Sequence, residues 1–133
     1  MNSPTAEYLL LFRVNEDSSS LSPEEIQTMI GKFLAWHARL TEEGKVIEAR
    51  PLARPAKIVS GKGGRVVADG PFAESKEAIN GFFLISANSM DEAVAIAQGC
   101  PGLEGGMKVE VRPVGERCQG QAQAKELHAE YSA

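Results

Sequence analysis

One stretch decides the fold: Asp69-Gly70-Pro71-Phe72, then Ala73-Glu74-Ser75-Lys76-Glu77, and then the apolar run Gly81-Phe82-Phe83-Leu84-Ile85. Asp-Gly and Gly-Pro are both turn dipeptides, so the chain changes direction sharply here, and Pro71 removes one backbone donor at the corner. The stretch therefore predicts a carboxylate, that of Asp69, held at a rigid bend ahead of a strand.

Two segments read as strands that are apolar on both faces. Residues 7 to 14 and 81 to 87 carry large apolar side chains at successive positions rather than at alternate ones. A strand with one wet face alternates, so both should be central in their sheet, with helices on one face and a second sheet on the other. The second sheet implies a homodimer.

A long helix is predicted after the first strand. Ser22 and Glu25 form a capping box around Pro23, and Gly44 supplies a left-handed stop after about Glu43. The periodicity predicts one buried stripe, made of Ile26, Ile30, Phe33 and Leu40. Met29 and Leu34 lie at its edges, and His37 lies near its middle.

The remaining elements follow from turn signals and alternation. We predict a second strand over residues 46–52, which its prolines confine to an edge or an irregular crossing. A hairpin with arms 56–60 and 65–69, a short helix capped by Ser89, and a last strand over 107–114 follow. In the short helix, Met90, Ala93 and Ala97 recur on one side. Residues 116–133 read as a polar tail after a domain spanning residues 1–115.

The order of these elements resembles the YCII-related family, also called DGPF-domain proteins. The resemblance rests on the central motif together with Tyr8-Leu9-Leu10-Leu11-Phe12, Leu21-Ser22-Pro23-Glu24-Glu25 and Val109-Glu110-Val111-Arg112-Pro113-Val114. It implies an α+β fold: a ferredoxin-like antiparallel sheet with two helices on one face plus an inserted β-hairpin, forming a dimeric α+β barrel. It also implies a link to extracytoplasmic-function sigma factors. Some relatives look to use a His on the first helix, one turn earlier, where this chain has Phe33.

Composition narrows the class of protein. The chain of 133 residues suits one domain, and a net charge of −4 with an isoelectric point near 5.2 argues against direct nucleic-acid binding. Cys100 and Cys118 form no CxxC pair, which predicts neither a disulfide framework nor a metal site. No segment approaches the about 20 apolar residues of a membrane span, and the N-terminus has no leader pattern, so we expect a cytoplasmic protein.

Asp69 and His37 are the candidate catalytic residues. Asp69 could act as a base or polar anchor, or simply accept hydrogen bonds from turn amides. His37 is the one group in the body of the domain that exchanges a proton near neutral pH, although a lone His on an apolar face is more often a packed residue.

The candidate substrate-binding residues are Arg112, Glu110, Tyr8 and Phe72. Glu110 and Arg112 project from one face of the last strand, where they line a dimer cleft, form a charged outer row or make a cross-strand salt bridge. In the cleft, Arg112 would be the anion binder. Tyr8 either lines the same cleft or belongs to the core.

Two functions remain open at this point. The first is a cofactor-independent enzyme, isomerase-like or lyase-like, that acts by proton transfer on a small molecule. The second is a non-catalytic ligand-binding or regulatory module linked to a sigma factor. No phosphate-binding loop, metal-ligand set or nucleophile motif is evident, so no cofactor is expected.

Overall fold

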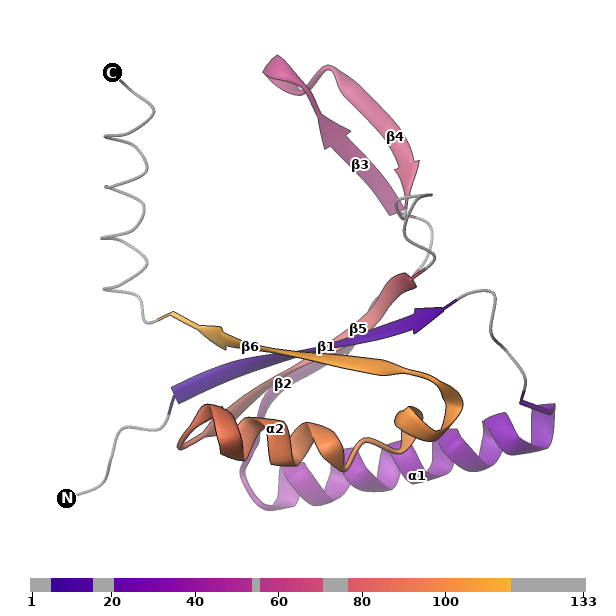
Figure 1. Ribbon diagram of the computed structural model, residues 1–133, viewed down its shortest axis with the longest axis vertical. Coiled ribbons are helices and arrows are strands. Elements are labelled where there is room, and N and C mark those ends of the chain that lie inside the picture. The colour runs from indigo at the N-terminus through magenta and orange to yellow at the C-terminus, as the bar shows by residue number, and fades with distance from the viewer. Residues whose placement is uncertain (1–5, 16–20, 54–55, 71–76, 116–133) are drawn as a thin grey trace.

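The computed structural model describes residues 6–15, 21–53, 56–70 and 77–115, and it has an α+β architecture (Figure 1). The elements are β1 (Ala6–Asn15), α1 (Pro23–Glu42), β2 (Val46–Pro51), β3 (Ala56–Ser60), β4 (Val66–Gly70), β5 (Glu77–Ala87), α2 (Met90–Gln98) and β6 (Lys108–Val114), with a 3-10 turn, η2 (Pro101–Gly105), before β6. Four antiparallel strands form the sheet in the order β2-β5-β1-β6. Both helices cover one face, which is consistent with the predicted ferredoxin-like fold.

The two strands that are apolar on both faces lie at the centre of the sheet, as predicted. β1 pairs with β5 on one side and with β6 on the other. Its side chains alternate: Tyr8, Leu10 and Phe12 are buried, whereas Leu9 and Leu11 are half-buried on the opposite face. Of the two alternatives for Tyr8, the cleft and the core, the structure shows the core.

A single core lies between the sheet and the helices. Its buried members come from β1, α1, β5, α2 and the residue before η2: Tyr8, Leu10, Phe12, Trp36, Leu40, Phe83, Ile85, Ala87, Ala93, Ile96, Ala97 and Cys100. Small alanines at positions 93 and 97 let α2 lie close to the sheet, as its sequence predicts.

The helix α1 begins and ends where its capping signals predict. The Ser22 hydroxyl accepts a hydrogen bond from the Glu25 backbone N–H at 3.1 Å, and the Glu25 carboxylate accepts one from the Ser22 backbone N–H, also at 3.1 Å. Both contacts with Ser22 lower the pKa of Glu25. The hydrogen bond from the Ser22 backbone N–H has the larger effect, and the Ser22 hydroxyl has the smaller one. At the other end Gly44 adopts φ of 74°, the left-handed conformation expected of a helix stop.

The predicted buried stripe of α1 is wrong in part. Trp36 and Leu40 are the buried residues of this helix, whereas Ile30 is 51% exposed. The helix is rotated so that Trp36 faces β1 and β5, which leaves Ile30 at the border of a pocket. Periodicity gives a stripe but does not tell which part of it the sheet covers.

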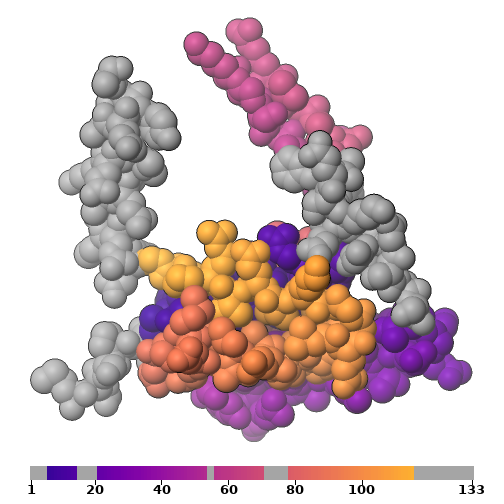
Figure 2. All heavy atoms as spheres, viewed as in Figure 1, coloured from indigo at the N-terminus to yellow at the C-terminus, as the bar shows by residue number. Residues whose placement is uncertain are grey.

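The predicted hairpin forms a separate two-stranded sheet, β3 with β4, between β2 and β5 in the chain. It extends from the sheet on the side away from the helices, and it stands apart from the body in the space-filling view (Figures 1 and 2). Its described residues contact mainly each other. We refer to β3 and β4 together as the arm.

The second and the last strand form the two edges of the sheet; for the second, an edge is one of the two predicted alternatives. β2 is one edge, and β6 is the other, with Val109 and Val111 packed on the core and Glu110 on the opposite face. Among the described helices, neither has the length and apolar character that crossing a membrane requires.

Candidate functional site

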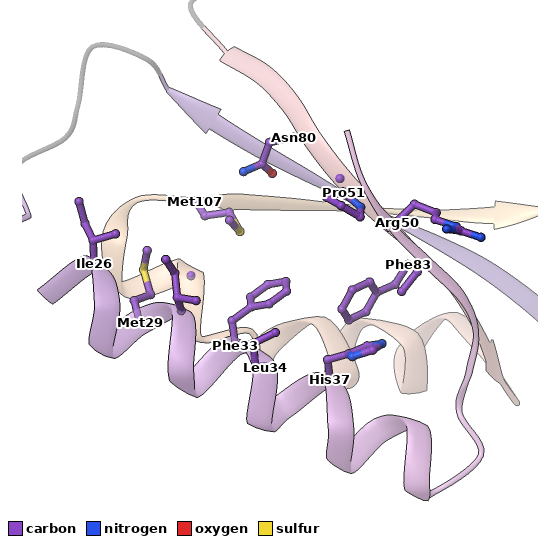
Figure 3. A pocket seen from close by; sticks show the side chains of 14 residues that line it. Ile26, Met29, Phe33, Leu34, His37, Arg50, Pro51, Asn80, Phe83 and Met107 are labelled. Carbon is purple, nitrogen blue, oxygen red and sulfur yellow. The ribbon is translucent and has the colours of Figure 1, made fainter. Parts of the chain in front are cut away.

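A pocket of about 540 Å³ opens between α1 and the sheet, beside η2 (Figure 3). Its volume lies within the range of about 300–1,000 Å³ that is usual for small-molecule sites. Most of the wall is apolar: Ile26, Met29, Ile30, Phe33 and Leu34 of α1, Ala49 and Pro51 of β2, Phe83 of β5, and Met107 before β6. We call this the α1 pocket.

Aromatic rings form the inner wall of the α1 pocket. Phe33 and Phe83 meet at 5.7 Å between ring centroids, and Trp36 stacks on Phe83 at 5.3 Å with an interplanar angle of 22°. Phe12 contacts the same Phe83 ring edge-on at 4.9 Å. Because each ring is held by two or more others, the wall is rigid, and Trp36 touches both pocket-lining phenylalanines.

His37 is a half-buried polar side chain of the α1 pocket. It extends from α1 beside Phe83, with 5.1 Å between the ring centroids (Figure 3). The Thr41 hydroxyl donates to the His37 carbonyl at 2.8 Å and lies 3.5 Å from His37 Nε2. Since the hydroxyl proton is already used, the Thr41 oxygen can only accept from Nε2, which favours the tautomer with Nδ1 unprotonated. Within the described residues, Nδ1 has no hydrogen-bond partner.

Asn80 enters the pocket wall through a β-bulge in β5. Phe12 of β1 pairs with Gly81, and Arg13 pairs with Ile79, so Asn80 is an extra residue without a partner in that ladder. A bulge redirects side chains, and here it places Asn80 in the pocket lining (Figure 3). The Asn80 carbonyl accepts a hydrogen bond from the Leu52 N–H at 2.9 Å, which ties the end of β2 to the bulge.

Gly81 allows the close approach of β2 that closes this side of the pocket. A Cβ at this position would lie 3.1 Å from the Arg50 carbonyl oxygen and 3.4 Å from Pro51 Cα, both of them backbone atoms. A side chain at position 81 would therefore need β2 to give way by a few tenths of an ångström.

Arg50 borders the α1 pocket, but its guanidinium group turns away from it (Figure 3). Arg50 Nε donates to Glu48 Oε1 at 2.9 Å on the exposed face of β2. The polar side chains directed to the pocket are thus His37 and Asn80. Such a site offers hydrogen bonds and proton exchange rather than a fixed positive charge.

The comparison of the sequence with protein families agrees with the topology. The family model for the YCII-related domain matches residues 6–116. The chain belongs to the YCII-related family. An uncharacterized protein of Rhizobium meliloti (strain 1021) is 33% identical over 93 residues, which cover 68% of this chain and 75% of that protein.

The structure places the predicted catalytic residues of this YCII-related chain in different elements. His37 lines the α1 pocket, whereas Asp69 lies in β4, on the arm, where its carboxylate is 86% exposed and pairs with Lys57. Asp69 does not line the pocket within this chain.

The predicted substrate-binding residues do not all lie together either. Glu110 pairs with Arg13 at 2.6 Å on the face of the sheet opposite the helices, and Arg112 Nε lies 3.7 Å from the other Glu110 carboxylate oxygen. Tyr8 is buried in the core, and Phe72 lies outside the described residues. The structure brings Glu110 and Arg112 together, but away from His37.

Asn80 and Thr41 are the site residues that sequence reasoning missed. A signal for Asn80 existed, because a Gly inside a strand often marks a bulge or a close backbone approach, and Gly81 follows Asn80 directly. For metals, no group of three His, Cys, Asp or Glu side chains gathers in the part of the chain that is described.

Proposed function

We propose that this YCII-related protein binds a small, mostly apolar molecule with one polar group in the α1 pocket. The observation that carries the proposal is the pocket itself, about 540 Å³ with an apolar wall and the His37 imidazole in its lining. An apolar body would contact Phe33 and Phe83, and a hydroxyl or similar group would meet His37 or Asn80.

Three probes test the apolar wall and the polar side chains of the α1 pocket separately: ethylbenzene, 4-ethylphenol and 4-ethylbenzoate. They share one apolar body and differ in the polar group. We expect saturable binding by calorimetry, a change in Trp36 emission, since Trp36 is the one Trp of the chain, and a preference for the phenol over ethylbenzene. The His37→Phe variant should keep ethylbenzene binding and lose the preference for the phenol.

Ile30→Lys tests the pocket with little cost to the core, because Ile30 is 51% exposed and lines the pocket. It should weaken binding of all three probes at least tenfold. Val94→Lys is the matched control, since Val94 is an exposed apolar helix residue outside the pocket. Equal losses in both variants, or no saturable binding by the unchanged protein, would count against the α1 pocket as a ligand site.

The catalytic form of the proposal is proton transfer by His37 without a cofactor. The specific support is the Thr41 contact, which favours protonation of Nε2 and leaves Nδ1 able to take a proton from a bound acidic C–H or O–H group. We expect the protein to exchange deuterium into a small cyclic ketone or enone in heavy water, and His37→Gln to lower the rate by about 100-fold or more. Exchange that is unchanged in His37→Gln would leave ligand binding, with a regulatory role, as the better proposal.

We also propose that the face of the sheet opposite the helices pairs with a second copy of the chain. Leu9 lies opposite Leu84, and Leu11 lies opposite Phe82, so four large apolar side chains occupy its centre. Charged residues border them: Glu48 and Arg50 on one edge strand, and Glu110 and Arg112 on the other. Sedimentation should show a dimer at micromolar concentration, and Leu84→Lys should give a monomer; a monomeric unchanged protein would rule the pairing out. We call the face of the sheet opposite the helices the open face.

A further inference from the structure

The two faces of the arm differ in charge. Two-stranded hairpins are at best marginally stable alone, and this arm has few contacts with the rest of the described chain. The pairing Ala56 with Gly70, Ile58 with Ala68 and Ser60 with Val66 gives one face without any charged side chain. On it Val66 is 52% exposed. We call this the uncharged face of the arm.

The other face of the arm has a different character. There Lys57 and Asp69 form an ion pair, next to the cross-strand pair of Val59 and Val67, whose side chains are 62% and 61% exposed. An ion pair with such exposure is suited to water, so this face can stay exposed. Covering this face would remove the Lys57–Asp69 pair from water, so we take the uncharged face as the one that a partner covers.

We propose that the uncharged face of the arm packs on a second copy of this chain, so that each subunit embraces the other. The arm extends on the same side of the sheet as the open face, away from the helices (Figures 1 and 2). A second copy that sits on the open face therefore meets the arm beside it. The inference rests on the dimer proposed above and adds the element that completes it.

Area supports this assignment. The open face has four strands, and its shortest strand, β2, has 6 residues, so its footprint is about 19 by 20 Å, or about 380 Å². Stable interfaces bury about 800 Å² on each partner, so the sheet alone supplies about half of what is needed.

The arms supply most of the remainder. Each arm has two strands of 5 residues, which gives a face of about 160 Å². In a two-fold pair each subunit gives one arm and receives another, so the arms add about 320 Å² on each partner and bring the interface near the standard size. A different protein seated on the open face would receive only one arm, which makes a second copy the better occupant.

Substitutions on the two faces of the arm test the proposal. Ile58→Lys and Val66→Lys change the uncharged face, and Val59→Lys and Val67→Lys are matched controls on the other face of the same strands. By sedimentation, each of the first two should raise the dimer dissociation constant at least tenfold, and the controls should change it less than threefold. Circular dichroism and thermal unfolding at high chain concentration check that the variants remain folded.

A crosslinking experiment identifies the occupant. A benzoyl-phenylalanine photocrosslinker at position 66 should yield covalent dimers on a denaturing gel, and the same group at position 67 should yield few. Crosslinks within one chain, or covalent dimers in equal amount from both positions, would overturn the proposal. So would a dimer that is lost in Leu84→Lys but unaffected by Ile58→Lys and Val66→Lys, since the open face would then pair without the arm. A monomeric unchanged protein refutes both the dimer and the arm contact.

Discussion

Replacement of Gly81 by Ala should destabilise the protein, although the same replacement at Gly31 should stabilise it. At position 81 the new methyl group meets the Arg50 carbonyl oxygen at 3.1 Å and Pro51 Cα at 3.4 Å, and because both are backbone atoms β2 must give way by a few tenths of an ångström. At position 31, on an exposed part of α1, a Cβ meets nothing within 4 Å.

The magnitudes follow from these contacts. Overpacking costs about 1–3 kcal/mol, and the lower entropy of the unfolded Ala chain offsets about 0.4–1 kcal/mol. The middle of these two ranges gives a loss of about 1–2 kcal/mol for Gly81→Ala. Gly31→Ala should gain about 0.8–1.0 kcal/mol from helix propensity alone. For a domain of this length, 1 kcal/mol corresponds to about 4 °C in Tm, so the two variants should differ by roughly 7–12 °C.

Urea unfolding followed by Trp36 emission measures both variants, at one chain concentration because subunit association would add to the apparent stability. The unfolding slope should stay constant, so that the midpoint alone reports the change. If Gly81→Ala were as stable as the unchanged protein while Gly31→Ala gained as expected, the close approach of β2 to β5 at the bulge would be wrong.

Three further predictions concern the cap, the core and the buried thiol. Ser22→Ala should cost about 1 kcal/mol in urea unfolding, because the Glu25 N–H loses its acceptor. Leu10→Ala, at a position that is 0% exposed, should cost about 2–5 kcal/mol, whereas Ile47→Ala, at 49% exposure, should change stability by less than about 1 kcal/mol. Burial raises the pKa of Cys100, against smaller lowering effects of the Gly102 and Leu103 amides, so the native state keeps the thiol proton after the unfolded chain has lost it. Stability should therefore fall as pH rises above the ordinary value of 9.0, and Cys100→Ala should flatten that fall.

The secondary structure could be predicted because its signals are local. The capping box at Ser22, the left-handed stop at Gly44 and the glycine-rich hairpin turn each depend on a few neighbouring residues. The central position of β1 and β5 could be predicted because both strands carry apolar side chains on both faces. Such side chains are favourable where both faces of the strand are covered.

The site could be predicted only in part because it depends on which faces meet. The stripe on α1 was visible, but the burial of Trp36 and the exposure of Ile30 follow from the rotation of the helix against β1 and β5. Likewise the Asp-Gly-Pro-Phe motif indicates a sharp turn, but where Asp69 lies depends on the direction in which the arm leaves the sheet. Those are long-range properties that no short stretch encodes.

The strand order has a consequence for how the protein is made. Arg13 and Glu110, which form an ion pair across β1 and β6, are 97 positions apart in the chain. At about 5–20 residues per second, a ribosome needs roughly 5–20 s to supply β6 after β1 has been synthesised. During that interval Tyr8-Leu9-Leu10-Leu11-Phe12, with apolar side chains on both faces and both edges unpaired, is in the growing chain without its partner strands. We expect the nascent protein to depend on a chaperone that holds this first strand until β5 and β6 have been made.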